Sequence, residues 1–227
     1  MITINNLTIS YNNQKVIDDL NLSMKEGFIH GIVGLNGAGK TTLLNTLFGL
    51  KKADAGTMLF DNHKLNKKAV AYLVTENFFY SNITGREYLN LFKNDAFKTE
   101  EWNRLFGLPL DRIIDGYSTG MKKKLALLGI LKQDKSLMIL DEPFNGLDIE
   151  TNRIIRMILL RLKEKNKTII VTSHIIETLT NLCDFIHYLE GGVIKFTRDK
   201  SGFSEFEQEV FAKIENDNLG LINELIR

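Results

Sequence analysis

The N-terminal part of the chain alternates between apolar and polar residues, which is typical of β-strands with one buried face. The alternating apolar positions are Ile2, Ile4, Leu7, Ile9, Leu20, Leu22 and Met24. A continuous apolar stretch over residues 28–33 then precedes a helical pattern that ends near Gly49, and further strands are predicted at 55–61 and 69–74. This part of the chain therefore predicts a β-rich subdomain followed by a strand–loop–helix unit.

Residues 84–131 change to helical spacing. Thr84 and Glu87 have the spacing of a capping box at a helix start. The apolar side of the predicted helices is supplied by Tyr88, Leu89, Leu91 and Phe92, and then by Trp102, Leu105 and Phe106. We therefore expect a mostly helical block between the first half of the chain and a later one.

The later half alternates between strands and helices. Residues 137–140 are wholly apolar, as expected of a strand buried on both faces of a parallel sheet. Helix 150–165, strand 168–172, helix 175–182 and strand 185–189 are predicted to follow. This alternation predicts an α/β sheet with right-handed crossovers. Residues 200–227 carry scattered apolar and acidic residues and are interpreted as a C-terminal appendage without an assigned role.

A glycine-rich loop lies between the first buried stretch and its helix, with the sequence Gly-Leu-Asn-Gly-Ala-Gly-Lys-Thr-Thr over residues 34–42. Such glycines let backbone N–H groups approach an anion at a helix N-terminus. Lys40 would reach the β- and γ-phosphates of a nucleotide, and the Thr41 hydroxyl would ligate Mg²⁺. A glycine-rich turn that merely caps a helix is the alternative reading.

Two carboxylates, Asp141 and Glu142, follow the buried strand at 137–140. Ligands of open parallel sheets gather at the carboxyl ends of the strands. Asp141 could hold Mg²⁺ from the side opposite Thr41, and Glu142 could orient or deprotonate an attacking water. Solvated acids that open a turn before Pro143 are the alternative.

Other polar residues give weaker signals. Ser118 and Gly120 stand at a helix start, where they could face a second anion or simply cap the helix. His174, taken alone, is interpreted as a loop histidine. Residues 122–124 are three lysines, which we expect on the solvated side of the helix start. The histidines His30, His63 and His187 lack metal-ligand spacing.

Composition excludes several classes of function. The 227 residues carry a net charge of +1, so no basic field favours nucleic acid. The single Cys183 excludes an internal disulfide and fits a reducing compartment. The N-terminus has no signal-peptide pattern, and no apolar run approaches the roughly 18 residues of a membrane span. We therefore expect a soluble chain that needs a partner for any membrane role.

Taken together, the motifs resemble the nucleotide-binding domain of ATP-binding cassette (ABC) proteins over residues 1 to about 197. Six elements occur in the family's order. These are an adenine-stacking aromatic (Tyr11), Walker A (34–42), the signature sequence (117–121), Walker B (137–142), the D-loop (144–148) and the switch histidine (172–174). The implied domain spans residues 1–199, with a helical subdomain at about 76–131 and the appendage at 200–227.

The resemblance implies an α/β P-loop NTPase fold with a RecA-like core, an N-terminal antiparallel β subdomain and an inserted helical subdomain. It implies ATP and Mg²⁺ as cofactors and Lys40, Glu142 and His174 as catalytic residues. The implied metal ligands are Thr41 and Asp141. The implied nucleotide contacts are Tyr11, Asn36, Gly37, Ala38, Gly39, Lys40, Thr41, Thr42, Ser118, Gly120 and Asp148.

One position departs from the family pattern. Where the family usually has a Gln that touches Mg²⁺, this chain has Thr75 with Glu76 beside it, and either could replace the Gln. The signature form and residues 84–87 most resemble ATPases of bacterial export systems, including exporters of drugs and peptides.

The resemblance also implies partners. Family members work as head-to-tail dimers in which the signature Ser and Gly of one domain complete the other's ATP site; a homodimer and a heterodimer both remain open. We expect an integral membrane permease as a further partner, no nucleic acid, and a cytoplasmic location on the inner face of the membrane. One alternative is a soluble ABC ATPase that acts on ribosomes or DNA. A second is a non-hydrolysing regulatory cassette, but the presence of Lys40, Asp141, Glu142 and His174 argues against it.

Overall fold

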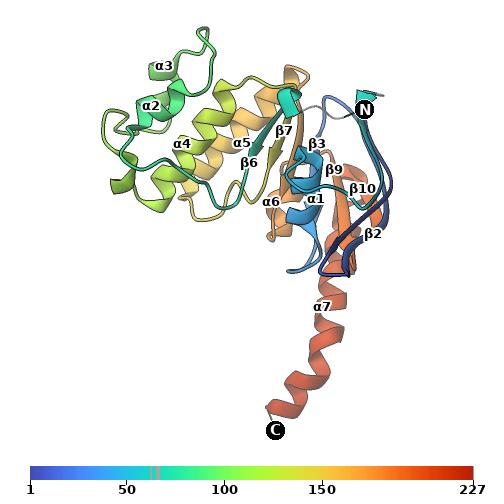
Figure 1. Ribbon diagram of the computed structural model, residues 1–227. Coiled ribbons are helices and arrows are strands. Elements are labelled where there is room, and N and C mark those ends of the chain that lie inside the picture. Colours follow the sequence, from blue (N-terminus) through green and yellow to red (C-terminus); the bar gives the residue numbers. More distant parts are fainter. Residues whose placement is uncertain (62, 65–66, 227) are drawn as a thin grey trace.

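The computed structural model describes residues 1–61, 63–64 and 67–226, which form two β-sheets, a helical block and a protruding C-terminal helix (Figure 1). The smaller sheet has four strands in the order β2-β1-β4-β5. These are β1 (Ile2–Tyr11), β2 (Gln14–Met24), β4 (Ala55–Phe60) and β5 (His63–Lys64), and every pairing is antiparallel. The predicted N-terminal antiparallel subdomain is thus confirmed.

The larger sheet has six strands in the order β10-β9-β3-β8-β7-β6. They are β3 (Ile29–Val33), β6 (Val70–Leu73), β7 (Leu137–Leu140), β8 (Thr168–Thr172), β9 (Phe185–Glu190) and β10 (Val193–Asp199). All neighbours are parallel except β10, which pairs antiparallel with β9 and was not predicted from the sequence. Every residue of β3, β7 and β8 is buried, which explains their continuous apolar character.

Apolar side chains cover both faces of the larger sheet. On one face, Ile32, Ile139 and Ile170 pack with the small sheet and with α1 (Lys40–Phe48). On the other face, Met138 and Val171 pack with three helices, α4 (Thr119–Lys132), α5 (Ile149–Glu164) and α6 (Ile176–Thr180). The strands are therefore held rigidly between two cores, and their carboxyl ends form a fixed platform.

The helical block contains α2 (Gly85–Asn90), α3 (Thr99–Asn103), a 3₁₀ turn, η2 (Ile114–Gly116), and the start of α4. The predicted capping box is present, because the Thr84 N–H donates to Glu87 Oε2 at 2.7 Å and the Glu87 N–H donates to Thr84 Oγ1 at 3.2 Å. The second predicted helix is shorter than expected. It ends before Leu105, and Gly107 then takes a left-handed φ of +62° that turns the chain.

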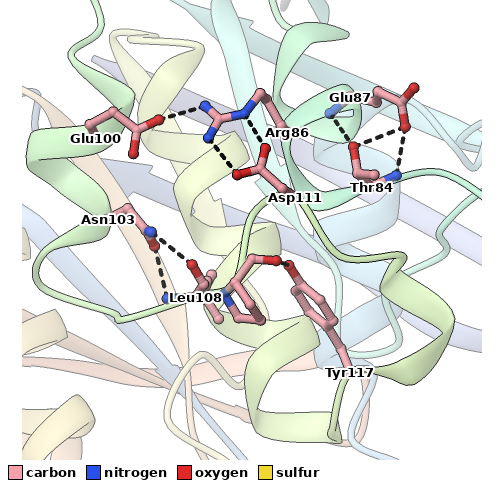
Figure 2. Close-up of polar contacts among 9 residues, drawn as sticks. Thr84, Arg86, Glu87, Glu100, Asn103, Leu108, Asp111 and Tyr117 are labelled. Atoms are coloured by element: carbon pink, nitrogen blue, oxygen red, sulfur yellow. Dashed lines mark hydrogen bonds and ion pairs between the residues drawn. The ribbon is translucent and has the colours of Figure 1, made fainter.

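Polar contacts tie this block together ahead of α4 (Figure 2). Arg86 of α2 donates through Nε to Asp111 Oδ1 at 2.6 Å and also pairs with Glu100 of α3. The Tyr117 hydroxyl donates to the Pro109 carbonyl at 2.6 Å. These contacts fix the loop before Ser118, and with it the first turn of α4.

The C-terminal appendage is a long helix, α7 (Phe203–Leu225), which follows the 3₁₀ turn η3 (Lys200–Gly202). Its first half is anchored, since Phe206 is fully buried and its ring lies 5.7 Å from that of Phe196 on β10. Its second half leaves the body of the protein (Figure 1) and exposes Leu219, Leu221, Ile222 and Leu225. Among the described residues, no helix combines the length and apolar character that crossing a membrane requires.

Candidate active site

The glycine-rich loop connects β3 to α1. Gly37 and Gly39 adopt left-handed φ angles of +81° and +103°, which side chains with a Cβ rarely adopt. A Cβ on Gly34 would lie 2.3 Å from the Leu189 carbonyl oxygen, so this position admits only glycine without movement of the backbone. The Lys40 ammonium donates to the Gly34 carbonyl at 2.6 Å. Burial lowers the pKa of Lys40, while the nearby carboxylates of Glu142 and Asp141 oppose that shift.

A pocket of about 480 Å³ opens over this loop. Its lining contains most residues predicted to bind nucleotide, together with the two carboxylates: Val16, Asn36, Gly37, Ala38, Gly39, Lys40, Thr41, Thr42, Thr75, Asp141 and Glu142. Val16 on β2 was missed, because nothing in its local sequence marks it. Thr75 lines the pocket and Glu76 does not, which favours Thr75 of the two alternatives.

Asp141 follows β7 and is held by two hydroxyl groups. Thr41 Oγ1 donates to Asp141 Oδ2 at 2.9 Å, and Thr172 Oγ1 donates to Asp141 Oδ1 at 2.6 Å. Asp141 is 1% exposed, so its carboxylate is fixed in orientation. The Thr41 and Asp141 oxygens suit a hard divalent cation whose remaining ligands are phosphates and water. In the part of the chain that the structure describes, no three or more His, Cys, Asp or Glu side chains cluster in a way that could hold a metal ion.

Glu142 is placed by its backbone as much as by its side chain. Its φ is +51°, an uncommon conformation for a residue with a Cβ. Its N–H donates to Thr172 Oγ1 at 2.9 Å, so one hydroxyl of β8 orients both acidic residues. The Glu142 carboxylate oxygen Oε2 lies 3.0 Å from His174 Nδ1. A carboxylate held this way at a pocket wall can accept a proton from a water molecule.

Lys123 contradicts the expectation that residues 122–124 lie on a solvated helix side. It is only 8% exposed, and its ammonium donates to the carbonyl oxygens of Glu142 and Asn145, the latter at 2.9 Å. Burial lowers its pKa, against the opposing effect of the Glu142 and Asp141 carboxylates. Lys123 is buried because its side of α4 faces the turn of residues 142–145, whereas Lys122 and Lys124 are half-exposed.

The remaining predicted residues do not line the pocket. Ser118 is exposed and caps α4 by accepting the Met121 N–H at 3.2 Å. Asp148 caps α5 by accepting the Thr151 N–H at 2.7 Å, and this hydrogen bond is the main cause that lowers the pKa of Asp148 to about 2. The Tyr11 ring is covered on one side by the Lys51 ammonium, 4.2 Å from its centroid.

The two sheets, the loop around Lys40 and the acidic pair after β7 define a P-loop nucleotide-binding protein. The sequence profile described as "ABC transporter" matches residues 17–145, and the chain belongs to this family.

The chain is 35% identical over 202 residues to the bacitracin transport ATP-binding protein BcrA of Bacillus licheniformis, covering 82% of this chain and 65% of BcrA. It is 27% identical over 217 residues to the lantibiotic transport ATP-binding protein SrtF of Streptococcus pyogenes, covering 92% and 95%. The cassette MJ0796, solved as a dimer in a post-hydrolysis state with ADP and Pi, superposes with a TM-score of 0.78 at 22% identity, covering 88% of this chain and 99% of that one. The predicted family and the role as an ATP-binding subunit of a transporter are confirmed. The predicted fold class is confirmed as well.

Proposed function

We propose that two cassettes of this kind close around two Mg-ATP molecules and thereby drive a separate membrane permease that exports a drug, a peptide or a similar small substrate. The observation that carries the proposal is the continuous set of contacts from Thr41 through Asp141 and Thr172 to Glu142 and His174, all beside the glycine-rich loop. This arrangement provides phosphate binding, cation binding and water activation in one pocket.

In the proposed mechanism the backbone N–H groups of residues 36–41 bind the phosphates. The Lys40 ammonium gives up its hydrogen bond to the Gly34 carbonyl and binds the β- and γ-phosphates instead. Thr41 and Asp141 would hold Mg²⁺, which offsets phosphate charge when bound. Glu142 accepts a proton from the attacking water, and His174 keeps the carboxylate oriented. Thr75, or Glu76 through a water molecule, would occupy the place of the usual Gln. Adenine would stack on the face of Tyr11 opposite Lys51.

Ser118, Gly120 and Asp148 do not line this pocket, and in the proposed dimer they act at the interface with the second cassette. Ser118 and Gly120 begin the 14-residue helix α4, whose N-terminus carries partial positive charge. In the proposed dimer this end faces the γ-phosphate bound by the other cassette, and Asp148 lies at the same interface. The dimeric solved cassette supports such an arrangement. Loss of the γ-phosphate on hydrolysis removes the attraction and lets the cassettes separate.

The export direction and the kind of substrate are proposed from the names of the relatives, which are ATP-binding proteins of bacitracin and lantibiotic transport. We place the cassette at residues 1–199, with residues 76–131 as the helical subdomain that docks the permease. Residues 200–227 lie outside it. The proposed location is the cytoplasmic face of the cell membrane.

An affinity-tagged chain, purified from detergent-solubilised membranes, tests this function. The expected result is a polytopic membrane protein recovered in a fixed ratio, together with Mg²⁺-dependent ATP hydrolysis. The same tag on an unrelated ATPase serves as the control. Recovery of ribosomes or DNA instead would favour a soluble ABC ATPase, and a complete lack of ATP turnover in the purified complex would contradict the proposal.

A further inference from the structure

Lys123 connects two parts of the chain that have different tasks in the proposed dimer. It lies in the second turn of α4, five residues after Ser118, and its ammonium reaches the turn formed by residues 142–145. That turn is closed by the Asn145 N–H, which donates to the Glu142 carbonyl at 3.3 Å. The Glu142 carbonyl oxygen therefore receives two donors, one of them charged.

The backbone of Glu142 is held from both sides. Thr172 accepts its N–H at 2.9 Å, and Lys123 with Asn145 satisfies its carbonyl. A left-handed conformation at a residue with a Cβ is unfavourable and persists only when the surroundings fix it. The charged hydrogen bond from Lys123 is a strong constraint of this kind, because hydrogen bonds to ionised groups exceed neutral ones. Movement of Lys123 would thus change the backbone conformation at Glu142 and shift its side-chain carboxylate.

Other residues in the first two turns of α4 also lie against this segment. A Cβ on Gly120 would lie 3.7 Å from the Gly146 carbonyl oxygen and 3.8 Å from Leu147 Cδ2, which is ordinary contact distance. Lys124 adds an ion pair to Asp148 at 3.4 Å. The N-terminal turns of α4 and residues 142–148 therefore have little freedom to move separately.

We propose that Lys123 is a positioning residue that couples the two ATP sites. It transmits binding of the other cassette's ATP at the Ser118 end of α4 to the Glu142 carboxylate of its own cassette. This inference rests on the proposed dimer, because only there does the N-terminus of α4 contact a nucleotide. The coupling makes Glu142 fully aligned only when the neighbouring site is filled.

Lys123→Met tests the proposal, since methionine keeps an unbranched side chain of similar length but donates no hydrogen bond. Lys122→Met is the matched control: it removes the same charge one residue earlier, at a half-exposed side chain. For Lys123→Met we expect kcat to fall about 10- to 100-fold, because small misplacements of a catalytic group have effects of this size. The Kd for a fluorescent ATP analogue should stay within about twofold, and the Hill coefficient for ATP should fall toward one. Lys123→Arg, which keeps charge and donors, should recover most of the lost turnover.

The outcomes separate this inference from the proposed function. If wild-type protein hydrolyses ATP cooperatively and Lys123→Met matches Lys122→Met in kcat and Hill coefficient, the coupling role is wrong. A loss of turnover accompanied by equal losses of nucleotide affinity and melting temperature in both Lys123 variants would show a structural role instead. If the wild-type protein has no Mg²⁺-dependent turnover, the proposed function itself fails, whatever the variants do.

Discussion

The Glu142 carboxylate and the His174 imidazole lie 3.0 Å apart at the edge of the pocket, although 32 residues separate them in the chain. Glu142 follows β7 and His174 follows β8, so adjacent parallel strands bring them together at one edge of the sheet. The imidazole can donate to a carboxylate that must accept a proton from water. The pair therefore has the geometry of a general base with an orienting partner.

Replacing His174 tests this relationship. We expect His174→Ala to reduce kcat about 100-fold, the usual size of a lost acid–base partner, while the Kd for ATP stays unchanged. Steady-state hydrolysis and equilibrium nucleotide titration measure the two effects. His174→Gln, which retains a donor, should be less impaired. Equal and full activity in both variants would remove His174 from the catalytic set.

Lys40 provides a second prediction, for binding rather than turnover. Its ammonium already rests against the Gly34 carbonyl inside the loop, where a phosphate would replace it. Lys40→Ala should weaken ATP binding by about 10- to 100-fold, because a charged hydrogen bond contributes roughly 1.5–3 kcal/mol. Lys52→Ala, at an exposed lysine, is the matched control. Unchanged affinity in Lys40→Ala would contradict phosphate binding by this loop.

A buried pair of histidines predicts how stability depends on pH. The Lys25 carbonyl can only accept, so His30 donates to it from Nε2 at 2.8 Å, and His30 Nδ1 must accept from His187 Nε2 at 3.1 Å. His187 Nδ1 then accepts the Thr197 hydroxyl at 2.8 Å. In this arrangement each imidazole is neutral, and both of its nitrogens have a hydrogen-bond partner. Burial lowers the pKa of His30, and burial together with the neighbouring His30 lowers the pKa of His187 to about 3.

Both pKa values are depressed, so below their ordinary value of 6.5 the unfolded chain binds more protons than the folded one. Stability is complete above that pH and is lost as the pH falls. For His187 the loss approaches about 1.4 kcal/mol per pH unit, and His30 adds a loss in the same direction. Urea unfolding between pH 7.5 and 5 measures how the free energy of unfolding changes with pH. Most carboxylates titrate below this pH range and therefore contribute little to the slope. His187→Gln should reduce the slope, and exposed His63→Gln should leave it unchanged. A flat stability profile over this range would contradict the neutral pair.

Phe206 predicts how strongly α7 is anchored. It is fully buried against Tyr188 and Phe196, whereas Phe211, on the same helix, is 50% exposed. Phe206→Ala should lower the free energy of unfolding by about 3–5 kcal/mol through lost contacts and a cavity. Phe211→Ala should change it by less than about 1 kcal/mol. Equal effects on urea unfolding would show that α7 does not pack on β9 and β10 as described.

The sequence predicted features that local chemistry determines. The capping box of Thr84 and Glu87, the end of α1 near Gly49 and the buried runs of β7 and β8 follow from residues close together in the chain, and the structure confirms them. The fold class, with its N-terminal antiparallel β subdomain and inserted helical subdomain, followed from family resemblance rather than from periodicity.

Features that depend on distant contacts could not be predicted from the sequence. Lys123 is buried only because the turn after Glu142 passes over it, and His30 meets His187 across 157 residues. β10 was missed because its residues are half-exposed on an edge strand and lack a continuous apolar run. The second predicted helix stops early because its apolar residues Leu105 and Phe106 belong to a turn. Tertiary contacts override local pattern in each case.

The central claim, that ATP holds two cassettes together until it is hydrolysed, is tested most directly by size-exclusion chromatography with light scattering on Glu142→Gln. This variant keeps the loop and the cation ligands but lacks the group that accepts the proton. We predict a stable dimer with ATP and Mg²⁺ and a monomer with ADP, and a monomer in both conditions when Ser118→Arg is added. A Glu142→Gln variant that binds ATP yet stays monomeric would contradict the account.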